Sequence, residues 1–328
     1  MAEQLFELVR KTFDTPHFRG ITFIEVEAKS IINHVPGDRL PFNYTINPYR
    51  GCSHACSYCF ARTTHTYMNM NAGRDFESKI VVKVNAPELL RKELRARKWK
   101  GEHIAMGTAT DPYQRAEGRY KLMTRIIETL TEFRNPFSIL TKGTLITRDL
   151  ELLQKAAEVT DLSTAFSIGT LDEDAWARSE PGTPHPRRRM ETVRRLNEAG
   201  IPCGVMLAPI LPGISDHPDQ LRAVIEAAFD AGATHVSPIL LHLRPGVKEE
   251  YMGWLEGNYP ELVPRYMSMY DRRSYAHESD RTALSKKVEA IKKATPRPKS
   301  NHHSSWPRRR SRERDQTPRA RSEQLSLI

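Results

Sequence analysis

The chain is poor in cysteine and has no long hydrophobic run. Four cysteines occur among its 328 residues, and no stretch approaches the roughly 18 consecutive apolar residues of a membrane-spanning helix. Glycine (17) and proline (22) stay near their usual abundance, which excludes collagen-like and linker-dominated chains. Hydrophobic residues make up 39% and charged residues 27% of the sequence, so a sizeable core is available and a wholly disordered chain is excluded.

A secretory signal is also missing from the start of the sequence. Glu3 stands where such a signal carries bases, and no apolar segment follows it. We therefore expect a cytoplasmic protein without a membrane partner. Cysteines in that reducing compartment rarely form disulfide frameworks, and three of the four fall within eight residues, at 52, 56 and 59. Their clustering favours metal binding over disulfide bonds.

Positive charge is concentrated at the C-terminus. Residues 295–328 contain nine Lys or Arg and three Asp or Glu, which leaves +4 of the formal net charge of +10 for residues 1–294. The segment is rich in proline, serine and arginine and nearly free of apolar side chains before its last four residues. Because it cannot bury enough surface to offset its conformational entropy, we predict a disordered basic tail.

Between residues 42 and 270, short apolar or β-branched runs alternate with helical patterns. The expected strands are Phe42–Ile46, His103–Gly107, Phe137–Thr141, Leu162–Ile168, Pro202–Ala208 and His235–Leu240. The expected helices are Pro87–Arg97, Tyr120–Phe133, Asp149–Val159, Pro186–Ala199 and Asp219–Ala231. This alternation predicts an α/β fold of parallel strands with right-handed crossovers, as an open sheet or curled toward a barrel. In both forms the ligand site lies at the carboxyl ends of the strands.

The segment 47–60, NPYRGCSHACSYCF, follows the first expected strand and holds Cys52, Cys56 and Cys59. Three thiolates on one short loop suit three corners of a cubane [4Fe–4S] cluster, which leaves the fourth iron open to another ligand. Structural zinc usually takes four protein ligands, and His54 or His65 would complete a Cys3His site. A third interpretation treats the cysteines as small hydrophobic residues, which requires their clustering to be a coincidence.

At this loop the sequence resembles the radical S-adenosylmethionine (SAM) superfamily. That family has Cys-x3-Cys-x2-Cys after its first strand, with an aromatic residue before the last cysteine, and Tyr58 matches this aromatic residue. The segments GTATDPYQ (107–114), LTK (140–142), FSI (166–168) and APILPG (208–213) resemble the spore-photoproduct-lyase-like branch. The resemblance spans residues 40–270 and so covers most of the ordered body.

The resemblance implies a partial (β/α)6 radical SAM barrel and its cofactors. The regions are an N-terminal extension (1–40), the core barrel (41–245), a C-terminal helical extension (246–294) and the basic tail (295–328). The three clustered cysteines would bind the [4Fe–4S] cluster, and SAM would chelate the open iron. One electron would cleave SAM to methionine and a 5′-deoxyadenosyl radical that abstracts hydrogen from the substrate. An electron donor such as flavodoxin or ferredoxin is then required.

Polar residues at the expected strand ends are candidate SAM contacts. Thr108 and Thr110 follow the second strand and offer hydroxyl and backbone groups to the SAM amino end. Asp111 either accepts a hydrogen bond from that ammonium or forms a turn with Pro112. Lys142 follows the third strand, where its compact charge suits the SAM carboxylate, although solvated lysines are common at strand ends. The resemblance favours the ligand interpretation of Lys142.

Two further residues, Ser167 and Tyr58, belong to the same region. Ser167 lies in an apolar strand, where it either faces the barrel lumen or bonds to a neighbouring backbone; the resemblance favours a SAM contact. Tyr58 is a candidate contact to SAM and the candidate catalytic residue.

Cys203 opens the fifth strand, away from the active site, and we interpret it as a buried small residue. Spore photoproduct lyase uses a cysteine near its second strand as hydrogen donor, and residues 106–110 here, MGTAT, contain none. This difference argues against photoproduct reversal itself.

Three consecutive arginines, Arg187 to Arg189, follow the rigid loop EPGTPHP (180–186) and begin a helix. Cations at a helix start oppose the helix dipole. Contact with an anion or a nucleic acid is one explanation, and a solvated helix face is the more common one.

The tail suggests a DNA-associated function. Its arginines suit phosphate backbones, and Trp306 is placed to stack on a base, although a solubilising tail is an equal explanation. The end, Gln324–Ile328, resembles the peptide by which bacterial repair and replication proteins bind the sliding clamp, with Ile328 in place of the usual aromatic residue or leucine.

From the cysteine loop, the family resemblance and the tail, we expect a radical SAM enzyme acting on DNA. The alternatives are a radical SAM enzyme acting on a small molecule or peptide, and a non-catalytic nucleic-acid-binding protein with a zinc site.

Overall fold

The structure is a computed structural model that describes residues 9–13, 15, 18–37, 40–271 and 273–297. Almost all of the predicted basic tail, including Trp306 and the clamp-like end Gln324–Ile328, lies outside the described residues.

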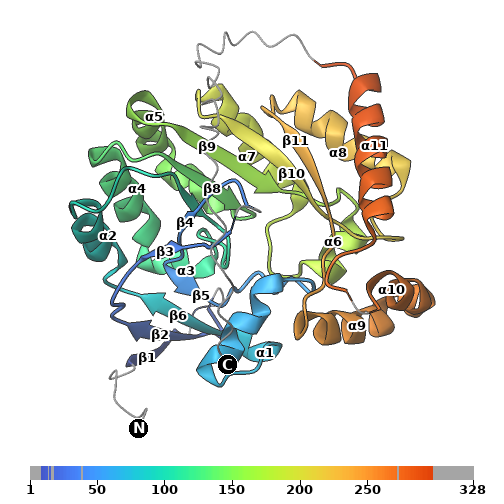
Figure 1. The fold of residues 1–328 in the computed structure, drawn as a ribbon, viewed down its shortest axis with the longest axis horizontal. Helices are drawn as coiled ribbons and strands as arrows, with labels where there is room; N and C mark the ends of the chain where they lie inside the picture. The colour runs from blue at the N-terminus through green and yellow to red at the C-terminus, as the bar shows by residue number, and fades with distance from the viewer. Residues whose placement is uncertain (1–8, 14, 16–17, 38–39, 272, 298–328) are drawn as a thin grey trace, which may run out of the picture. The chain divides into compact units, whose positions relative to one another are not determined.

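Seven strands of the described chain form the main sheet, in the order β11–β10–β9–β8–β7–β4–β3 (Figure 1). Their bounds are β3 Ile32–His34, β4 Tyr44–Ile46, β7 Ile104–Met106, β8 Phe137–Thr141, β9 Leu162–Ser167, β10 Cys203–Ile210 and β11 Val236–Leu240. The strands from β4 to β11 pair in parallel, and only β3 is antiparallel to its neighbour. Each parallel strand overlaps one expected from the sequence. The predicted α/β fold, a partial (β/α)6 barrel, is therefore confirmed.

Helices lie around the outside of this curved sheet (Figure 1). Those between the strands are α2 Ala86–Leu94, α3 Arg115–Tyr120, α4 Leu122–Glu132, α5 Leu150–Val159, α6 Glu173–Ser179, α7 Pro186–Glu198 and α8 Pro218–Asp230, with the 3-10 helix η2 Thr144–Asp149. In α4 the apolar side chains at helical spacing, Ile126, Ile127 and Leu130, are buried and face the core. Pro186 begins α7, where its missing N–H leaves no hydrogen bond unmade. The helices expected from the sequence between the strands therefore overlap helices of the structure.

A second sheet, which the sequence did not predict, has the order β1–β2–β6–β5. Its strands are β1 Val9–Thr12, β2 Thr22–Val26, β5 Tyr49–Arg50 and β6 Lys79–Lys83, and the 3-10 helix η1 Phe60–Met68 and helix α1 Arg74–Ser78 lie between β5 and β6. The strand β2 pairs in parallel with β6. Because β3 also pairs with β4 of the main sheet, the described strands among the first 40 residues are an integral part of the fold.

Helices α9 Val247–Asn258, α10 Val263–Tyr270 and α11 Glu278–Ala294, with the short η3 Pro260–Leu262, follow β11. The helix α11 buries Leu284, Val288 and Ile291 and packs against α8 and β11. The helix α9 packs against η1, which directly follows the clustered cysteines. No helix in the described part of the chain is both long enough and apolar enough to cross a bilayer.

Candidate active site

The three clustered cysteines lie on one loop, residues 51–59, between β5 and η1. The sequence predicted this loop directly after Phe42–Ile46, whereas the structure inserts β5, so the loop leaves from the second sheet. Gly51 begins the loop with a φ of 82°, and a Cβ at this position would lie 2.9 Å from the carbonyl oxygen of Phe76. Ala55 also has left-handed backbone, with a φ of 54°. Such backbone is uncommon outside glycine and gathers at functional sites.

The three thiols are free, and Cys52 and Cys56 are only 7% and 6% exposed. Burial raises the pKa of all three, for Cys56 to about 12, so the thiols stay protonated until a metal replaces the protons. Within the described residues, no group of three or more His, Cys, Asp or Glu converges on a single metal ion. Tetrahedral zinc requires that convergence, whereas a cubane cluster binds each thiolate through a different iron.

One ring nitrogen of each histidine in the zinc alternative lies close to another group. His54 Nδ1 lies 3.3 Å from Oδ2 of Asp111. His65 is buried, its Nε2 lies 2.9 Å from the carbonyl oxygen of Lys79, and its ring meets Phe76 edge-on. Nδ1 of His65 is buried and makes no hydrogen bond to the described residues, whereas three thiols without a fourth converging ligand suit a cubane cluster.

Arg62 holds the cysteine loop from the side of η1. Its side chain is 4% exposed, and Nε and Nη2 donate to the carbonyl oxygen of Cys56 at 3.1 and 2.9 Å. Nη1 donates to the carbonyls of Ala72 and Gly73, and the guanidinium pairs with Glu77. A single arginine thus fixes the backbone of the middle cysteine to the start of α1.

We expect Arg62→Lys to lower the free energy of unfolding by at least about 2 kcal/mol, because a compact ammonium cannot reach the three carbonyls and Glu77 that the planar guanidinium contacts. Chemical denaturation of the protein provides the measurement. The control is Arg74→Lys, which changes an exposed arginine on α1 in the same way. Equal stability of the two variants would contradict this role of Arg62.

The segment after α6 holds the loop from the other side. The backbone N–H of Ser57 donates to the carbonyl of Ser179 at 2.9 Å, and that of Gly182 donates to the carbonyl of His54 at 3.0 Å. A Cβ at Gly182 would lie 2.2 Å from the carbonyl oxygen of Ser53, so only glycine permits this approach. The loop EPGTPHP therefore packs directly on the cysteine loop, which the sequence did not predict.

Glu180 is the centre of a buried charge cluster beside the loop. Its carboxylate accepts hydrogen bonds from the Tyr58 hydroxyl and from Arg189, and its Oε1 lies 3.2 Å from Nζ of Lys142. Burial raises the pKa of this carboxyl, but the charges of Arg189 and Lys142 outweigh burial and lower it to about 2. Glu180 is therefore ionised at neutral pH and compensates two cations.

The three arginines at the start of α7 have different environments. Arg187 and Arg188 are exposed, as expected for a solvated helix face. Arg189 is only 1% exposed, so the interpretation as a solvated helix face is wrong for this residue. Arg189 precedes Val193 and Leu196 by one and two helical turns, so it shares their buried face. This spacing is the sequence signal that separates Arg189 from its neighbours.

Lys142 has an ammonium group with unused donors. Its Nζ is buried and makes no hydrogen bond to the described residues, although it lies within ion-pair distance of Glu180. It also lies 5.7 Å from the centre of the Tyr58 ring. A buried ammonium whose donors are unsatisfied favours the binding of an anion.

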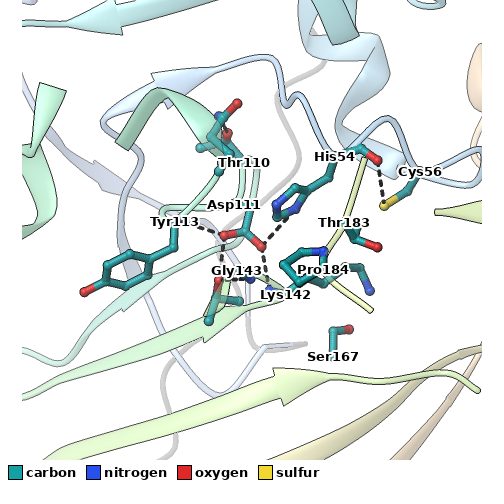
Figure 2. A network of polar contacts seen from close by, with 12 residues as sticks. His54, Cys56, Thr110, Asp111, Tyr113, Lys142, Gly143, Ser167, Thr183 and Pro184 are labelled. Atoms are coloured by element: carbon teal, nitrogen blue, oxygen red, sulfur yellow. Dashed lines mark hydrogen bonds and ion pairs between the residues drawn. The ribbon is translucent and has the colours of Figure 1, made fainter. Parts of the chain in front are cut away.

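Asp111 is the centre of a network at the strand ends (Figure 2). It accepts hydrogen bonds from the Thr141 hydroxyl at 2.6 Å, from the backbone N–H of Lys142 at 2.6 Å and from that of Tyr113 at 2.9 Å. With His54 close to one oxygen, both oxygens have partners. The structure therefore favours the turn interpretation of Asp111 over contact with an ammonium.

The hydroxyl of Thr110 supports the cysteine loop. It donates to the carbonyl oxygen of Gly51 at 2.8 Å, and Nε2 of Gln114 donates to the same oxygen at 2.9 Å. Oε1 of Gln114 accepts from the backbone N–H of Ser53 at 3.0 Å. The segment after β7 thus holds the start of the loop, and the sequence did not predict the part of Gln114.

The remaining predicted residues lie at the ends of their strands. The Ser167 hydroxyl donates to the carbonyl of Ala208 at 2.9 Å, and Thr108 is half-buried just after β7. The SAM contacts predicted for Thr108, Thr110 and Ser167 stay predictions. Cys203 is fully buried at the start of β10, which confirms its interpretation as a buried small residue.

Comparison with known proteins identifies the family. The model of the radical SAM superfamily matches residues 46–226. An uncharacterised protein of Mycobacterium tuberculosis (strain ATCC 25618 / H37Rv) is 49% identical over 274 residues, which are 83% of this chain and 81% of that protein. A radical SAM Nalpha-GlyT isomerase of Pseudomonas phage M6 is 25% identical over 194 residues, 58% of this chain and 37% of that protein.

A similar fold occurs in a solved structure. It is a double mutant of spore photoproduct lyase with bound AdoMet and dinucleoside spore photoproduct, with a TM-score of 0.62 and 16% identity over 88% of this chain and 84% of that chain. The fold, the cysteine loop and the matching family model agree, and the chain belongs to the radical SAM superfamily.

Proposed function

We propose that Cys52, Cys56 and Cys59 bind a [4Fe–4S] cluster and that the protein is a radical SAM enzyme acting on a nucleotide in DNA. Membership of the superfamily implies an enzyme that uses SAM and such a cluster. The observation that carries the site assignment is a set of three free thiols on one loop, with no single-ion site among the described residues. When bound, the cluster supplies the electron that cleaves SAM to methionine and a 5′-deoxyadenosyl radical.

The residues around the loop are suited to orient SAM. Lys142 offers its unused donors to the SAM carboxylate, and Glu180 compensates the lysine charge before SAM arrives. Tyr58 donates its hydroxyl to Glu180 and keeps its ring beside the ammonium of Lys142. We therefore assign Tyr58 a positioning role. Thr108, Thr110 and Ser167 are proposed as further contacts, through backbone groups where their hydroxyls are already bonded.

A DNA substrate is supported by two observations. The spore photoproduct lyase structure with the similar fold holds a dinucleoside spore photoproduct, and the last 34 residues of this chain carry a net charge of +6. Reversal of the photoproduct itself is disfavoured, because MGTAT at 106–110 lacks a cysteine and Cys203 lies at the opposite ends of the strands. We propose another nucleotide lesion or modified base, whose radical regains hydrogen from a donor other than a protein thiol.

The partners follow from this chemistry. We propose that flavodoxin or ferredoxin delivers the electron in the cytoplasm, that the basic tail binds DNA phosphates, and that Gln324–Ile328 binds the sliding clamp.

The test is 5′-deoxyadenosine formation by anaerobically reconstituted protein with dithionite and SAM, with and without oligonucleotides. We expect brown protein, product formation that rises with DNA, and retention of DNA on filters at low salt that weakens as salt increases. Deletion of 299–328, which leaves every described residue in place, should reduce retention. No DNA retention, together with unchanged activity after the deletion, would favour a small-molecule or peptide substrate. Colourless protein that forms no 5′-deoxyadenosine would favour the zinc alternative.

A further inference from the structure

A pile of three aromatic rings begins beside the cysteine loop. The ring of Phe60, which directly follows Cys59, is centred 5.6 Å from that of His242, and His242 is centred 5.3 Å from Tyr275. The interplanar angles are 35° for the first pair, which is tilted, and 20° for the second, which is stacked. Phe60 is 38% and Tyr275 45% exposed. The two outer rings are therefore accessible from solvent, and the half-buried His242 lies between them.

A guanidinium group lies over each end of the pile. That of Arg244 is 5.8 Å from the centre of the Phe60 ring, and that of Arg281 is 5.9 Å from the centre of the Tyr275 ring. Both distances are close to the limit of about 6 Å for a cation–π contact. Both arginines are exposed, and neither forms an ion pair with any carboxylate that the structure describes. Their charges remain available to an anionic partner.

The middle ring is suited to its position between the arginines. Burial and the nearby Arg244 lower the pKa of His242, so its imidazole is neutral at physiological pH. A neutral ring stacks without repelling the two guanidinium groups, and it leaves its flat faces to other rings.

The pile draws on three distant segments that meet at the candidate active site. Phe60 belongs to the start of η1, and His242 and Arg244 follow the carboxyl end of β11. Tyr275 lies between α10 and α11 and is joined to His242 by an isolated antiparallel bridge. Because ligands of parallel α/β sheets bind at the carboxyl ends of the strands, this surface lies at the end of the sheet where a substrate is expected.

We propose that the surface formed by Arg244, Phe60, His242, Tyr275 and Arg281 binds an unpaired DNA strand next to the nucleotide in the active site. The inference rests on the proposed nucleotide substrate and names the residues that hold the flanking strand. Aromatic rings stack on bases of any sequence, and arginines at the ends of the pile can turn to the phosphates. An acidic peptide would use the two charges but would leave the exposed rings of Phe60 and Tyr275 without a partner. Chemistry on a base also requires an unpaired or extruded nucleotide.

Tyr275→Ala and Arg244→Gln test the surface, and Tyr67→Ala and Arg222→Gln are their matched controls. Tyr67 is 84% exposed on η1 outside the pile, and Arg222 is an exposed arginine on α8. The measurement is fluorescence anisotropy of a labelled single-stranded oligonucleotide with the full reconstituted chain. We expect Tyr275→Ala to weaken binding roughly tenfold. We expect Arg244→Gln to reduce the slope of log affinity against log salt by about 0.7, with both controls unchanged.

Photo-cross-linking provides a measurement that does not depend on variants. An oligonucleotide containing 5-iododeoxyuridine should cross-link to a peptide that carries Phe60, His242 or Tyr275. If the wild-type protein binds no oligonucleotide, the proposed DNA substrate fails and this inference fails with it. If it binds, but both variants behave as their controls and the cross-links lie elsewhere, this inference alone is wrong. Binding of an acidic peptide in place of the oligonucleotide would assign the surface to a protein partner and overturn the inference.

Discussion

Serine in place of Cys52, Cys56 or Cys59 is expected to abolish cluster binding and, with it, 5′-deoxyadenosine formation. Each thiolate holds a different iron of a cubane cluster, and the described residues around the loop offer no set of side chains that converges as a replacement site. A serine hydroxyl is a poor ligand for iron in such a cluster because soft thiolates select Fe–S clusters. Iron content and visible absorption after anaerobic reconstitution provide the measurement, followed by the yield of 5′-deoxyadenosine with dithionite and SAM.

Cys203→Ala is the matched control for this experiment. Cys203 is fully buried at the start of β10 and has no part in the loop. We expect it to retain the iron content and the 5′-deoxyadenosine yield of the unchanged protein. Wild-type iron content in a loop variant, or loss of iron in Cys203→Ala, would show that the ligands are assigned wrongly.

Glu180→Gln is expected to destabilise the protein by about 3–5 kcal/mol, because it leaves two buried cations without compensation. Arg189 is 1% exposed and donates to this carboxylate, and Nζ of Lys142 lies 3.2 Å from it. The amide keeps the size of the side chain, so the loss reports charge and not packing. Denaturant unfolding of this variant and of Glu191→Gln, an exposed residue of α7, gives the comparison. Equal stability of the two would rule out the charge cluster as a major support of the loop.

The same carboxylate predicts a pH dependence of stability. The pKa of Glu180 is lowered from 4.5 to about 2 in the folded protein. A lowered pKa adds stability that is fully present above the unfolded value and is lost as pH falls through the folded one. About 3 kcal/mol of stability should therefore disappear between pH 4.5 and pH 2. This loss should be absent from Glu180→Gln.

Local patterns predicted the barrel because most of its elements carry their own signal. The strand β8 occupies the expected residues Phe137–Thr141, and α4 buries the face that its periodicity indicates. The strand β5 has two residues, too few for any periodicity. The second sheet depends on pairing between β2 and β6, more than 50 residues apart in sequence, which no local pattern encodes.

The candidate site also has one part that local sequence predicts and another part that depends on the fold. The spacing of the three cysteines is local and predicted one loop that carries all three thiols. The supports of the loop are not local, because Tyr58 and Glu180 are separated by 122 positions and meet only in the fold. The sequence around Arg62 gives no sign of its role, because the carbonyl groups that it contacts are brought together only by the fold. Arg189 is the exception, since helical spacing assigns it to the buried face of α7.

Electron paramagnetic resonance of the reduced, reconstituted protein, before and after addition of SAM, tests the central claim most directly. The account predicts about four irons per chain and a cluster signal that changes when SAM binds the iron without a protein ligand. A full complement of iron with a spectrum that stays the same in saturating SAM would contradict it.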